Sequence, residues 1–187
     1  MGGAEYMKSI KKYETIINEA LRSALEYDTP EGQINEFISF FGKHIGSDRI
    51  YIFEDDEEHH VTNNTYEWCT EGITPQIEHL QGVNMEVIDW WYDTFDEGKS
   101  VIISDVEELK GVHQVSYNML KYQNVRKVVV SPLRHKGQIK GFFGVDNPPA
   151  VDYSALTMFL DMIGTMLISL LKIRNTFQKE QYNASMS

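Results

Sequence analysis

The clearest pattern of apolar and polar positions lies in residues 125–148, where two β-rich runs flank a polar break. Residues 128–130 are all valine, residues 134–137 read Arg-His-Lys-Gly, and the second run holds Ile139, Phe142, Phe143 and Val145. Two such runs joined by a glycine-containing turn predict a β-hairpin. Apolar residues at consecutive positions predict strands at the centre of a sheet, where both faces are covered.

Two glycines and one proline modify this hairpin. Gly141 and Gly144 leave the backbone bare, so a helix, a neighbouring strand or a ligand can approach closely there. We expect a helix or a neighbouring strand at these glycines, and any ligand elsewhere, against the helix that contains Trp91. Pro132 cannot donate to the strand ladder, which predicts a bulge or an unpaired position.

Two amphipathic helices are predicted before the first strand. Residues 6–27 carry a stripe of apolar side chains at alternating spacings of three and four, formed by Ile10, Tyr13, Ile17, Ala20 and Ala24. Thr29 can cap the second helix, and Pro30 suits its first position. That helix extends toward Gly46, with an inner face formed by Ile34, Phe37, Ile38, Phe41 and Ile45.

The middle of the chain alternates between short strands and short helices. Its pattern predicts a strand at 49–53, an acidic loop at 54–58, a returning strand at 60–69, an irregular segment at 72–82, a helix at 85–97, a strand at 100–106 and a helix at 112–122. Gly98 ends the first of these two helices.

A long helix is predicted at the end of the sequence. Asp152 is a suitable N-cap, and the apolar periodicity continues to about Gln181. Two overlapping stripes run along the helix, one formed by Leu156, Leu160, Ile163 and Leu167 and the other by Phe159, Ile163, Met166, Leu170, Ile173 and Phe177. At about 1.5 Å per residue, thirty residues span roughly 45 Å, which is longer than a small sheet needs. One stripe can therefore cover the sheet while the other meets a second helix, and the overhang points toward a partner or a following domain.

Composition narrows the location and the partners that we expect. The 187 residues fit one domain, and the formal net charge of −11 disfavours binding to phosphate backbones. The single cysteine, Cys69, excludes an intramolecular disulfide and a multi-cysteine zinc site. The sequence starts without a signal-peptide pattern, and its longest apolar stretch, residues 162–173, is too short to span a bilayer. We therefore expect a soluble cytoplasmic protein that binds neither nucleic acid nor membrane.

Several short motifs follow one another between about residues 30 and 172. They are Asp-Arg-Ile-Tyr-Ile-Phe at 48–53, Asn-Thr-Tyr-Glu-Trp-Cys at 64–69, Gly-Ile-Thr-Pro at 72–75, Trp-Trp at 90–91, Ile-Ser-Asp-Val at 103–106, Val-Ser-Pro-Leu at 130–133 and Lys-Gly-Phe-Phe-Gly-Val-Asp at 140–146. In this order they resemble a GAF domain, the small sensor fold of bacterial signalling proteins. The resemblance is strongest to the GAF domains placed before GGDEF diguanylate cyclase domains.

This resemblance implies an α+β fold of the GAF/PAS-like type. A central antiparallel sheet would carry a bundle of terminal helices on one face and short helices over a pocket on the other. Residues 1–29 would form an N-terminal signalling helix, 30–172 the GAF domain, and 173–187 a helical overhang toward an output domain. Terminal helices of such domains commonly pair across a homodimer. A GGDEF sequence is not part of this chain, so the covalently linked output domain would lie outside it.

Five residues are candidates for a ligand pocket with aromatic walls and a few polar groups. Tyr66 and Trp68 lie two apart on a predicted strand and therefore share a face. Together with Trp91, His113 and Tyr117 they can line a small-molecule site. The alternative is that these side chains fill an ordinary aromatic core. The sequence does not name a ligand or a cofactor.

This sequence lacks the residue motifs that known GAF domains use for bilin attachment, methionine sulfoxide reduction or cyclic-nucleotide binding. Phytochrome domains attach a bilin through a cysteine beside a histidine, whereas Cys69 precedes Thr70. The methionine sulfoxide reductases of this fold use several cysteines, and cyclic-nucleotide-binding members carry an Asn-Lys…Phe…Asp-Glu signature that is missing here. His59 and His60 would point to opposite faces of a strand and so would not converge on a metal. We find no catalytic constellation and expect no enzymatic activity in this chain.

Two functions remain in competition. The first is a regulatory sensor that binds a small molecule and moves its terminal helices, with a diguanylate cyclase as the output domain suggested by the resemblance. The second is a dimerisation and signal-relay module without a ligand. An unfilled cavity beneath the helices at 85–97 and 112–122 would favour the sensor, and a packed interior would favour the relay.

Overall fold

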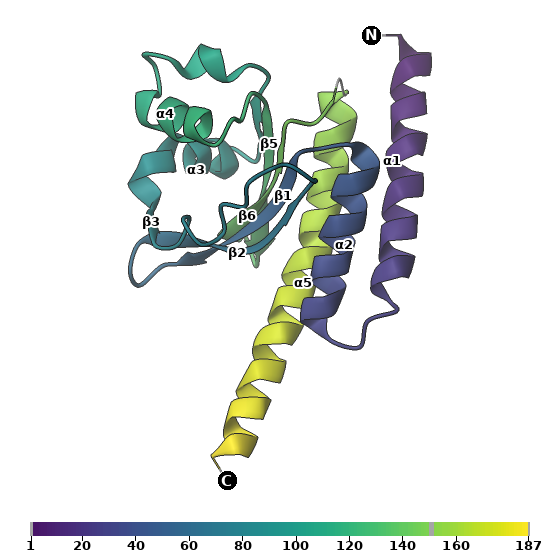
Figure 1. Ribbon diagram of the computed structural model, residues 1–187, viewed down its shortest axis with the longest axis vertical. Helices are drawn as coiled ribbons and strands as arrows, with labels where there is room; N and C mark the ends of the chain where they lie inside the picture. The colour runs from purple at the N-terminus through teal and green to yellow at the C-terminus, as the bar shows by residue number, and fades with distance from the viewer. Residues whose placement is uncertain (1, 150–151, 187) are drawn as a thin grey trace.

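A computed structural model describes residues 2–149 and 152–186. Its elements, in chain order, are α1 (Gly3–Ala24), α2 (Pro30–Ile45), β1 (Arg49–Asp56), β2 (Val61–Cys69), β3 (Val83–Asn84), η1 (Met85–Ile88), α3 (Asp89–Asp96), β4 (Val101–Ile103), η2 (Val106–Leu109), α4 (Gln114–Tyr122), β5 (Val128–His135), β6 (Gln138–Asp146) and α5 (Tyr153–Ser185), with η denoting a 3-10 helix. The six strands form one sheet in the order β3-β2-β1-β6-β5-β4, and every neighbouring pair is antiparallel (Figure 1). This confirms the predicted α+β fold.

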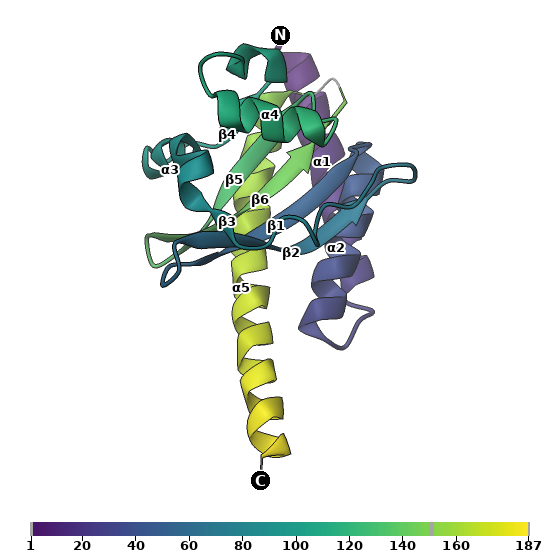
Figure 2. The same ribbon diagram turned by 60° about the vertical axis from the view of Figure 1, so that its left-hand side comes forward.

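The two faces of the sheet carry different cores because side chains alternate along each strand. On β1, Ile50 and Ile52 face the long helices α1, α2 and α5, whereas Tyr51 and Phe53 face the short helices. Figure 2 shows α3 and α4 on one side of the sheet and α5 on the other. The predicted separation of terminal helices from short helices is therefore observed.

The ends of the long helices follow the sequence signals. The Thr29 hydroxyl accepts a hydrogen bond from the Gly32 amide at the start of α2, and Asp152 accepts one from the Ala155 amide at the start of α5. Gly46 ends α2 with a φ of 76°, in the left-handed region that glycine adopts at low cost. These contacts supply partners for backbone groups that helix termini otherwise leave unpaired.

The helix α5 extends well past the sheet. Its buried residues, which begin with Ala155 and end with Leu171, pack on the sheet and on the other long helices, whereas residues 172–185 are mostly exposed. Fourteen further residues of helix add about 20 Å, and Figure 1 shows this segment projecting away from the rest of the molecule. By length and composition α5 is apolar enough to cross a membrane, but 44% of its most apolar window is buried inside the protein. Covering the sheet accounts for much of this apolarity.

Several predicted boundaries were wrong in the middle of the chain. Residues 54–56, expected in an acidic loop, continue β1, because their backbone pairs with residues 61–63 of β2. The predicted helix at 85–97 is split into η1 and α3, and the predicted strand at 100–106 ends at Ile103. The two-residue strand β3 was missed, since so short an element has no periodicity to detect.

In the hairpin of β5 and β6, the backbone of Gly141 and Gly144 is in close contact with a neighbouring strand. A Cβ added at Gly141 would overlap the carbonyl oxygen of Phe53, and one added at Gly144 would overlap the ring of Tyr51. Phe53 and Tyr51 both belong to β1, so the expectation that a neighbouring strand lies against these glycines is confirmed. The register of β5 against β6 shifts just after Pro132, which is the predicted irregularity.

Candidate functional site

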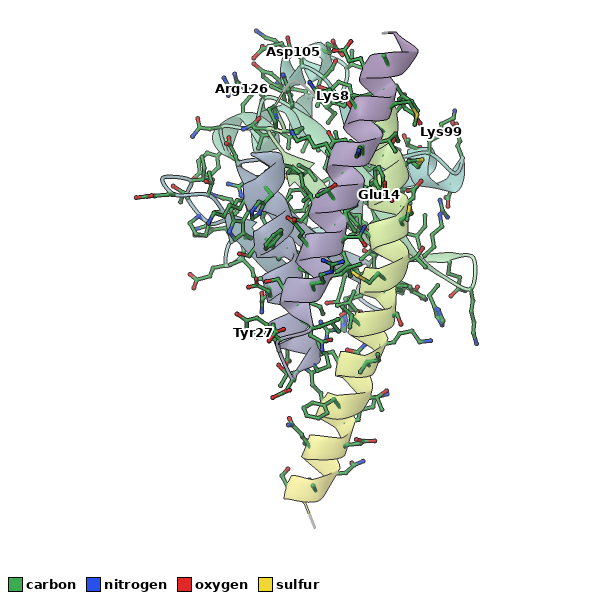
Figure 3. All side chains as sticks on the ribbon, turned by 90° about the vertical axis from the view of Figure 1, so that its right-hand side faces the viewer. Lys8, Glu14, Tyr27, Lys99, Asp105 and Arg126 are labelled. Atoms are coloured by element: carbon green, nitrogen blue, oxygen red, sulfur yellow. The ribbon has the colours of Figure 1, made fainter. Side chains whose placement is uncertain are left out.

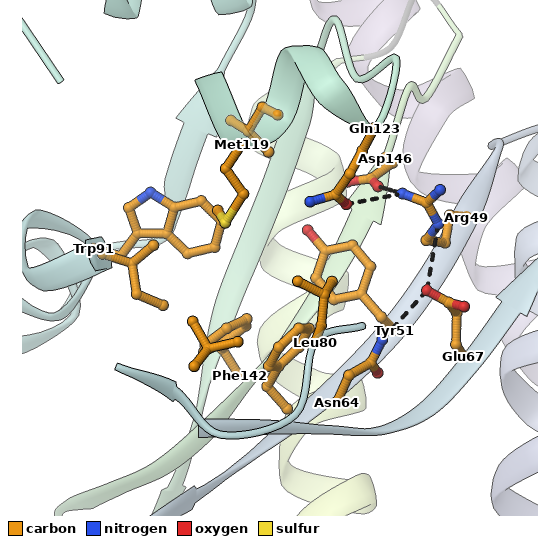
Figure 4. A pocket seen from close by; sticks show the side chains of 14 residues that line it. Arg49, Tyr51, Asn64, Glu67, Leu80, Trp91, Met119, Gln123, Phe142 and Asp146 are labelled. Carbon is orange, nitrogen blue, oxygen red and sulfur yellow. Dashed lines mark hydrogen bonds and ion pairs between the residues drawn. The ribbon is translucent and has the colours of Figure 1, made fainter. Parts of the chain in front are cut away.

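A cavity lies between the sheet and its cover of short elements. Its floor is formed by β1, β2 and β6, and its roof by η1, α3, α4 and the segment that leads into β3 (Figure 4). The free space is about 40 Å³, which is room for a few water molecules. This is the place beneath the two predicted helices where a sensor was expected to have a cavity.

One end of the cavity is aromatic and aliphatic. Phe53 stacks on Phe142 with ring centroids 4.7 Å apart, and Trp91 meets Phe142 edge-on at 5.5 Å. The remaining apolar lining consists of Tyr51, Leu80, Val83, Ile88, Met119 and Leu120. Rings held at these angles form rigid flat walls.

The other end is built around a buried arginine at the start of β1. The Arg49 Nη1 donates to Asp146 Oδ2 at 2.7 Å and to Gln123 Oε1 at 3.4 Å, while Nη2 donates to the Thr74 carbonyl at 3.0 Å. Glu67 Oε1 lies 3.4 Å from Arg49 Nε. The side chains of Arg49, Asp146 and Glu67 are each at most 3% exposed.

A β-bulge places two of these polar groups on one face. The register of β1 against β2 skips Thr65, because Ile52 pairs with Tyr66 and Phe53 pairs with Asn64. The extra residue reverses the alternation, so Asn64 and Glu67 both face the cavity although they are three residues apart. The Asn64 Nδ2 then donates to Glu67 Oε1 at 3.3 Å.

Glu67 also holds the irregular segment that borders the cavity. Its Oε2 accepts hydrogen bonds from the amides of Gln76 at 2.8 Å and Ile77 at 3.1 Å. One carboxylate thus connects Arg49 to the segment at 72–82. Two or more charge-assisted bonds at one buried group fix its position strongly.

Two carboxylates share one guanidinium at this polar end. Burial raises the pKa of Asp146 to about 6, against the opposing effect of the Arg49 charge. Burial also raises the pKa of Tyr51 well above its ordinary value, and the nearby Asp146 charge adds to this. With both acids ionised, the buried group of Arg49, Asp146 and Glu67 carries a net charge of −1.

Of the five predicted site residues, Trp91 lines the cavity. Tyr66 and Trp68 do share a face, as expected, but it is the opposite face of the sheet. Trp68 lies on the bare backbone of Gly42 in α2, and the Tyr66 hydroxyl accepts a hydrogen bond from Arg174 Nη1 at 3.2 Å. The structure therefore does not bring these two residues together with Trp91.

The other two predicted residues lie on the cover and do not line the cavity. The His113 ring stacks on Trp90 at 4.3 Å, at the start of α4. The Tyr117 hydroxyl donates to Glu107 at 3.1 Å. Both side chains make contacts within the cover.

Sequence reasoning missed the polar end of the cavity. The signal was present: Arg49 begins one buried strand, Asp146 ends another, and the two residues are direct cross-strand partners. A charged residue inside an otherwise apolar strand needs a partner when it is buried. The pairing of β1 with β6, which the sequence does not state, is what brings these charges together.

Comparison with solved structures identifies the architecture. No protein-family model and no curated protein sequence matches the chain significantly. A phycocyanobilin-bound GAF domain from a cyanobacterial phytochrome is 16% identical over 89% of this chain and 96% of that one, with a TM-score of 0.67. The chain has the GAF fold. The GAF domain of an Acinetobacter phosphoenolpyruvate-protein phosphotransferase is similar as well, at 11% identity over 96% and 99% of the two chains and a TM-score of 0.59.

An enzyme shares this fold. The free methionine-R-sulfoxide reductase from Neisseria meningitidis, solved in complex with its substrate, is 11% identical over 89% of this chain and 92% of its own, with a TM-score of 0.65. In the present chain, burial raises the pKa of Cys69, followed in importance by the charge of Glu67. A raised pKa keeps this thiol protonated and weakly nucleophilic at neutral pH.

Proposed function

We propose that this GAF domain is a regulatory sensor that binds a small molecule in the cavity and relays the signal through its terminal helices to an output domain. The observation that carries the proposal is the cavity itself, which combines flat aromatic walls with buried, incompletely paired polar groups. Asp146 Oδ1 and Asn64 Oδ1 accept no hydrogen bond from the described residues. Buried polar atoms left without partners are costly, and a ligand or water can supply the missing bonds.

Binding in this cavity requires the cover to move outward, and the elements of the cover are short. The strand β3 has two residues, η1 has four, and α3 and α4 have eight and nine. A metabolite needs roughly 300 Å³ or more, so binding requires this cover to lift from the sheet. Short elements with few ladder bonds open at lower cost than the long helices do.

A single strand connects the cavity to α5. On β1, Tyr51 and Phe53 line the cavity, and Glu54 is the next residue. Both Glu54 carboxylate oxygens accept from Arg174, with Nη2 at 2.7 Å and Nη1 at 2.9 Å. The Arg174 guanidinium also lies 5.6 Å from the centre of the Tyr66 ring. A shift of β1 on binding would therefore pull on α5 at the point where it leaves the domain.

We propose a homodimer through the terminal helices. The exposed side of α5 carries the apolar residues Met158, Met162, Ile173 and Phe177, which are 39–60% exposed. Figure 3 looks onto α1, whose exposed side chains include Lys8 and Glu14. The output domain we propose is a GGDEF diguanylate cyclase following α5, on the strength of the sequence resemblance. We propose no catalytic role for this chain itself.

A metabolite screen by thermal shift tests the sensor proposal. Wild-type protein is expected to show a raised melting temperature with at least one class of small molecule. Replacing Leu80 by Phe at the cavity edge is expected to abolish that shift, while the matched exchange at Leu25, which is 75% exposed, leaves it unchanged. A screen without any shift, or a shift that Leu80→Phe leaves intact, contradicts binding in this cavity.

A further inference from the structure

The charge of the cavity limits the class of ligand, and this inference rests on the proposed sensor function. Arg49, Asp146 and Glu67 together carry one excess negative charge in a site that is almost fully buried. The whole chain, these three residues included, carries a formal net charge of −11. A negative potential in a low-dielectric site attracts cations and repels anions.

Among the described residues that line the site, the cation is Arg49, and both of its Nη atoms are already engaged. Nη1 is engaged by Asp146 and Gln123, and Nη2 by the Thr74 carbonyl. Its Nε has no hydrogen-bond partner among the described residues, but it lies 3.4 Å from the Glu67 carboxylate, whose charge opposes an anion. A carboxylate or phosphate ligand would have to displace Asp146 from the guanidinium at 2.7 Å. That exchange would leave a buried carboxylate without its partner, which is strongly unfavourable.

The unpaired atoms of the site include two acceptors, beside the donors Arg49 Nε and Trp91 Nε1. Asp146 is 2% exposed and Asn64 is 1% exposed, both line the cavity, and in each the Oδ1 atom lacks a hydrogen bond from the described residues. Acceptors of this kind are matched by ligand N–H groups. A cationic N–H donor gains further because hydrogen bonds between charged groups are about twice as strong as neutral ones.

The walls fix the shape of the remaining part of the ligand. Phe53 and Phe142 are nearly parallel, with an interplanar angle of 15°, and Trp91 closes the side. Aromatic faces also attract cations directly. From the charge, the free acceptors and the flat walls, we infer that the cavity binds an organic cation with N–H donors on a flat apolar body, of the amidine, guanidine or arylamine class.

Three probes of one shape and different charge test this inference on the wild-type protein. Benzamidine is cationic, benzamide neutral and benzoate anionic. Titrations followed by the indole N–H signals of the three tryptophans report whether a probe reaches Trp91. Benzamidine is expected to bind about tenfold or more tightly than benzamide, with no binding of benzoate. Asp146→Asn is expected to abolish this preference, and Glu58→Gln on the exposed turn to leave it intact.

The outcomes separate the inference from the sensor function. If benzoate or benzamide binds as tightly as benzamidine and shifts the Trp91 signal, the cationic ligand class is wrong while the sensor function stands. If Asp146→Asn does not fold, the order of affinities of the three probes on the wild type still decides. If none of the three shifts the Trp91 signal, the inference is overturned; only an additional failure of the metabolite screen would overturn the sensor function as well.

Discussion

The ring of Tyr51 lies on the bare backbone of Gly144, so that a Cβ added to Gly144 would overlap the Cε2, Cζ and Oη atoms of the tyrosine. The two residues are direct cross-strand partners on β1 and β6. Gly144 therefore makes room for the side chain that forms part of the cavity floor. In the sequence, the bare backbone of Gly144 suggested that a ligand could approach there. In the structure, this bare backbone instead accommodates Tyr51, which forms part of the cavity floor.

Gly144→Ala is expected to destabilise the protein by about 1–3 kcal/mol, because Tyr51 must leave its position. Urea unfolding measures the change. Gly164→Ala in α5 is the control, since a Cβ there meets Leu133 and Pro132 at an ordinary 3.5 Å. That exchange is expected to be neutral or stabilising by up to about 1 kcal/mol, because alanine favours the helix. Equal losses in both variants would contradict the packing described for Tyr51.

Arg49→Met is expected to cost about 3–5 kcal/mol of unfolding free energy, because it leaves two buried carboxylates without a counter-charge. Asp146→Asn is expected to cost less than about 2 kcal/mol, since the amide oxygen can still accept from Arg49 while Glu67 balances the charge. Chemical denaturation of the two variants side by side gives the comparison. A larger loss for Asp146→Asn would mean that the two acids do not share the guanidinium.

The raised pKa of Asp146 predicts a particular dependence of stability on pH. Between the ordinary value of 3.8 and the folded value of about 6, the folded protein holds a proton that the unfolded chain releases. This group therefore stabilises the fold as the pH falls from 6 to 4, by up to about 3 kcal/mol, and the contribution is lost as the pH rises through 6. The groups that face Asp146 are Arg49, Tyr51 and Glu67.

Unfolding free energies of wild type and Asp146→Asn, measured from pH 4 to pH 7, isolate this contribution. The wild type is expected to gain stability relative to the variant as the solution becomes more acidic. A difference that stays flat, or that changes in the opposite direction, would show that burial does not dominate the ionisation of Asp146.

The contact between Arg174 and Glu54 is expected to hold the C-terminal part of α5 to the sheet. Arg174→Met should cost about 1 kcal/mol and speed amide hydrogen exchange in residues 172–180, because the two-pronged ion pair is partly buried. Lys99→Met removes an ion pair with Glu97 whose side chains are 69% and 63% exposed, and should change neither quantity. Unchanged exchange in Arg174→Met would remove the link between β1 and α5.

The sequence was sufficient for the large elements because their signals are local. The apolar stripes, the cap residues Thr29 and Asp152, and the valine run of β5 each predict an element without reference to the rest of the chain. Short elements such as β3 and η2, with two and four residues, are too short to show a periodicity in the sequence. The place of the pocket, beneath the helices predicted at 85–97 and 112–122, came from the resemblance to GAF domains and not from a local pattern.

The polar end of the site could not be predicted because it depends on long-range pairing. Arg49 and Asp146 meet through the register of β1 with β6, across 97 positions of sequence. Regular alternation along β2 correctly predicted that Tyr66 and Trp68 share a face. It did not tell which of the two faces of the sheet these side chains occupy. The bulge at Thr65 then moved Asn64 and Glu67 together onto the cavity face.

Native mass spectrometry of the protein purified from cells tests the central claim most directly, because it reports a retained ligand and the oligomeric state together. We predict a dimer that carries a small molecule, which is released on unfolding and is not retained by Leu80→Phe. A monomer or dimer at the bare mass of the chain, in a protein whose melting temperature no metabolite shifts, would contradict the sensor account and leave a relay module without a ligand.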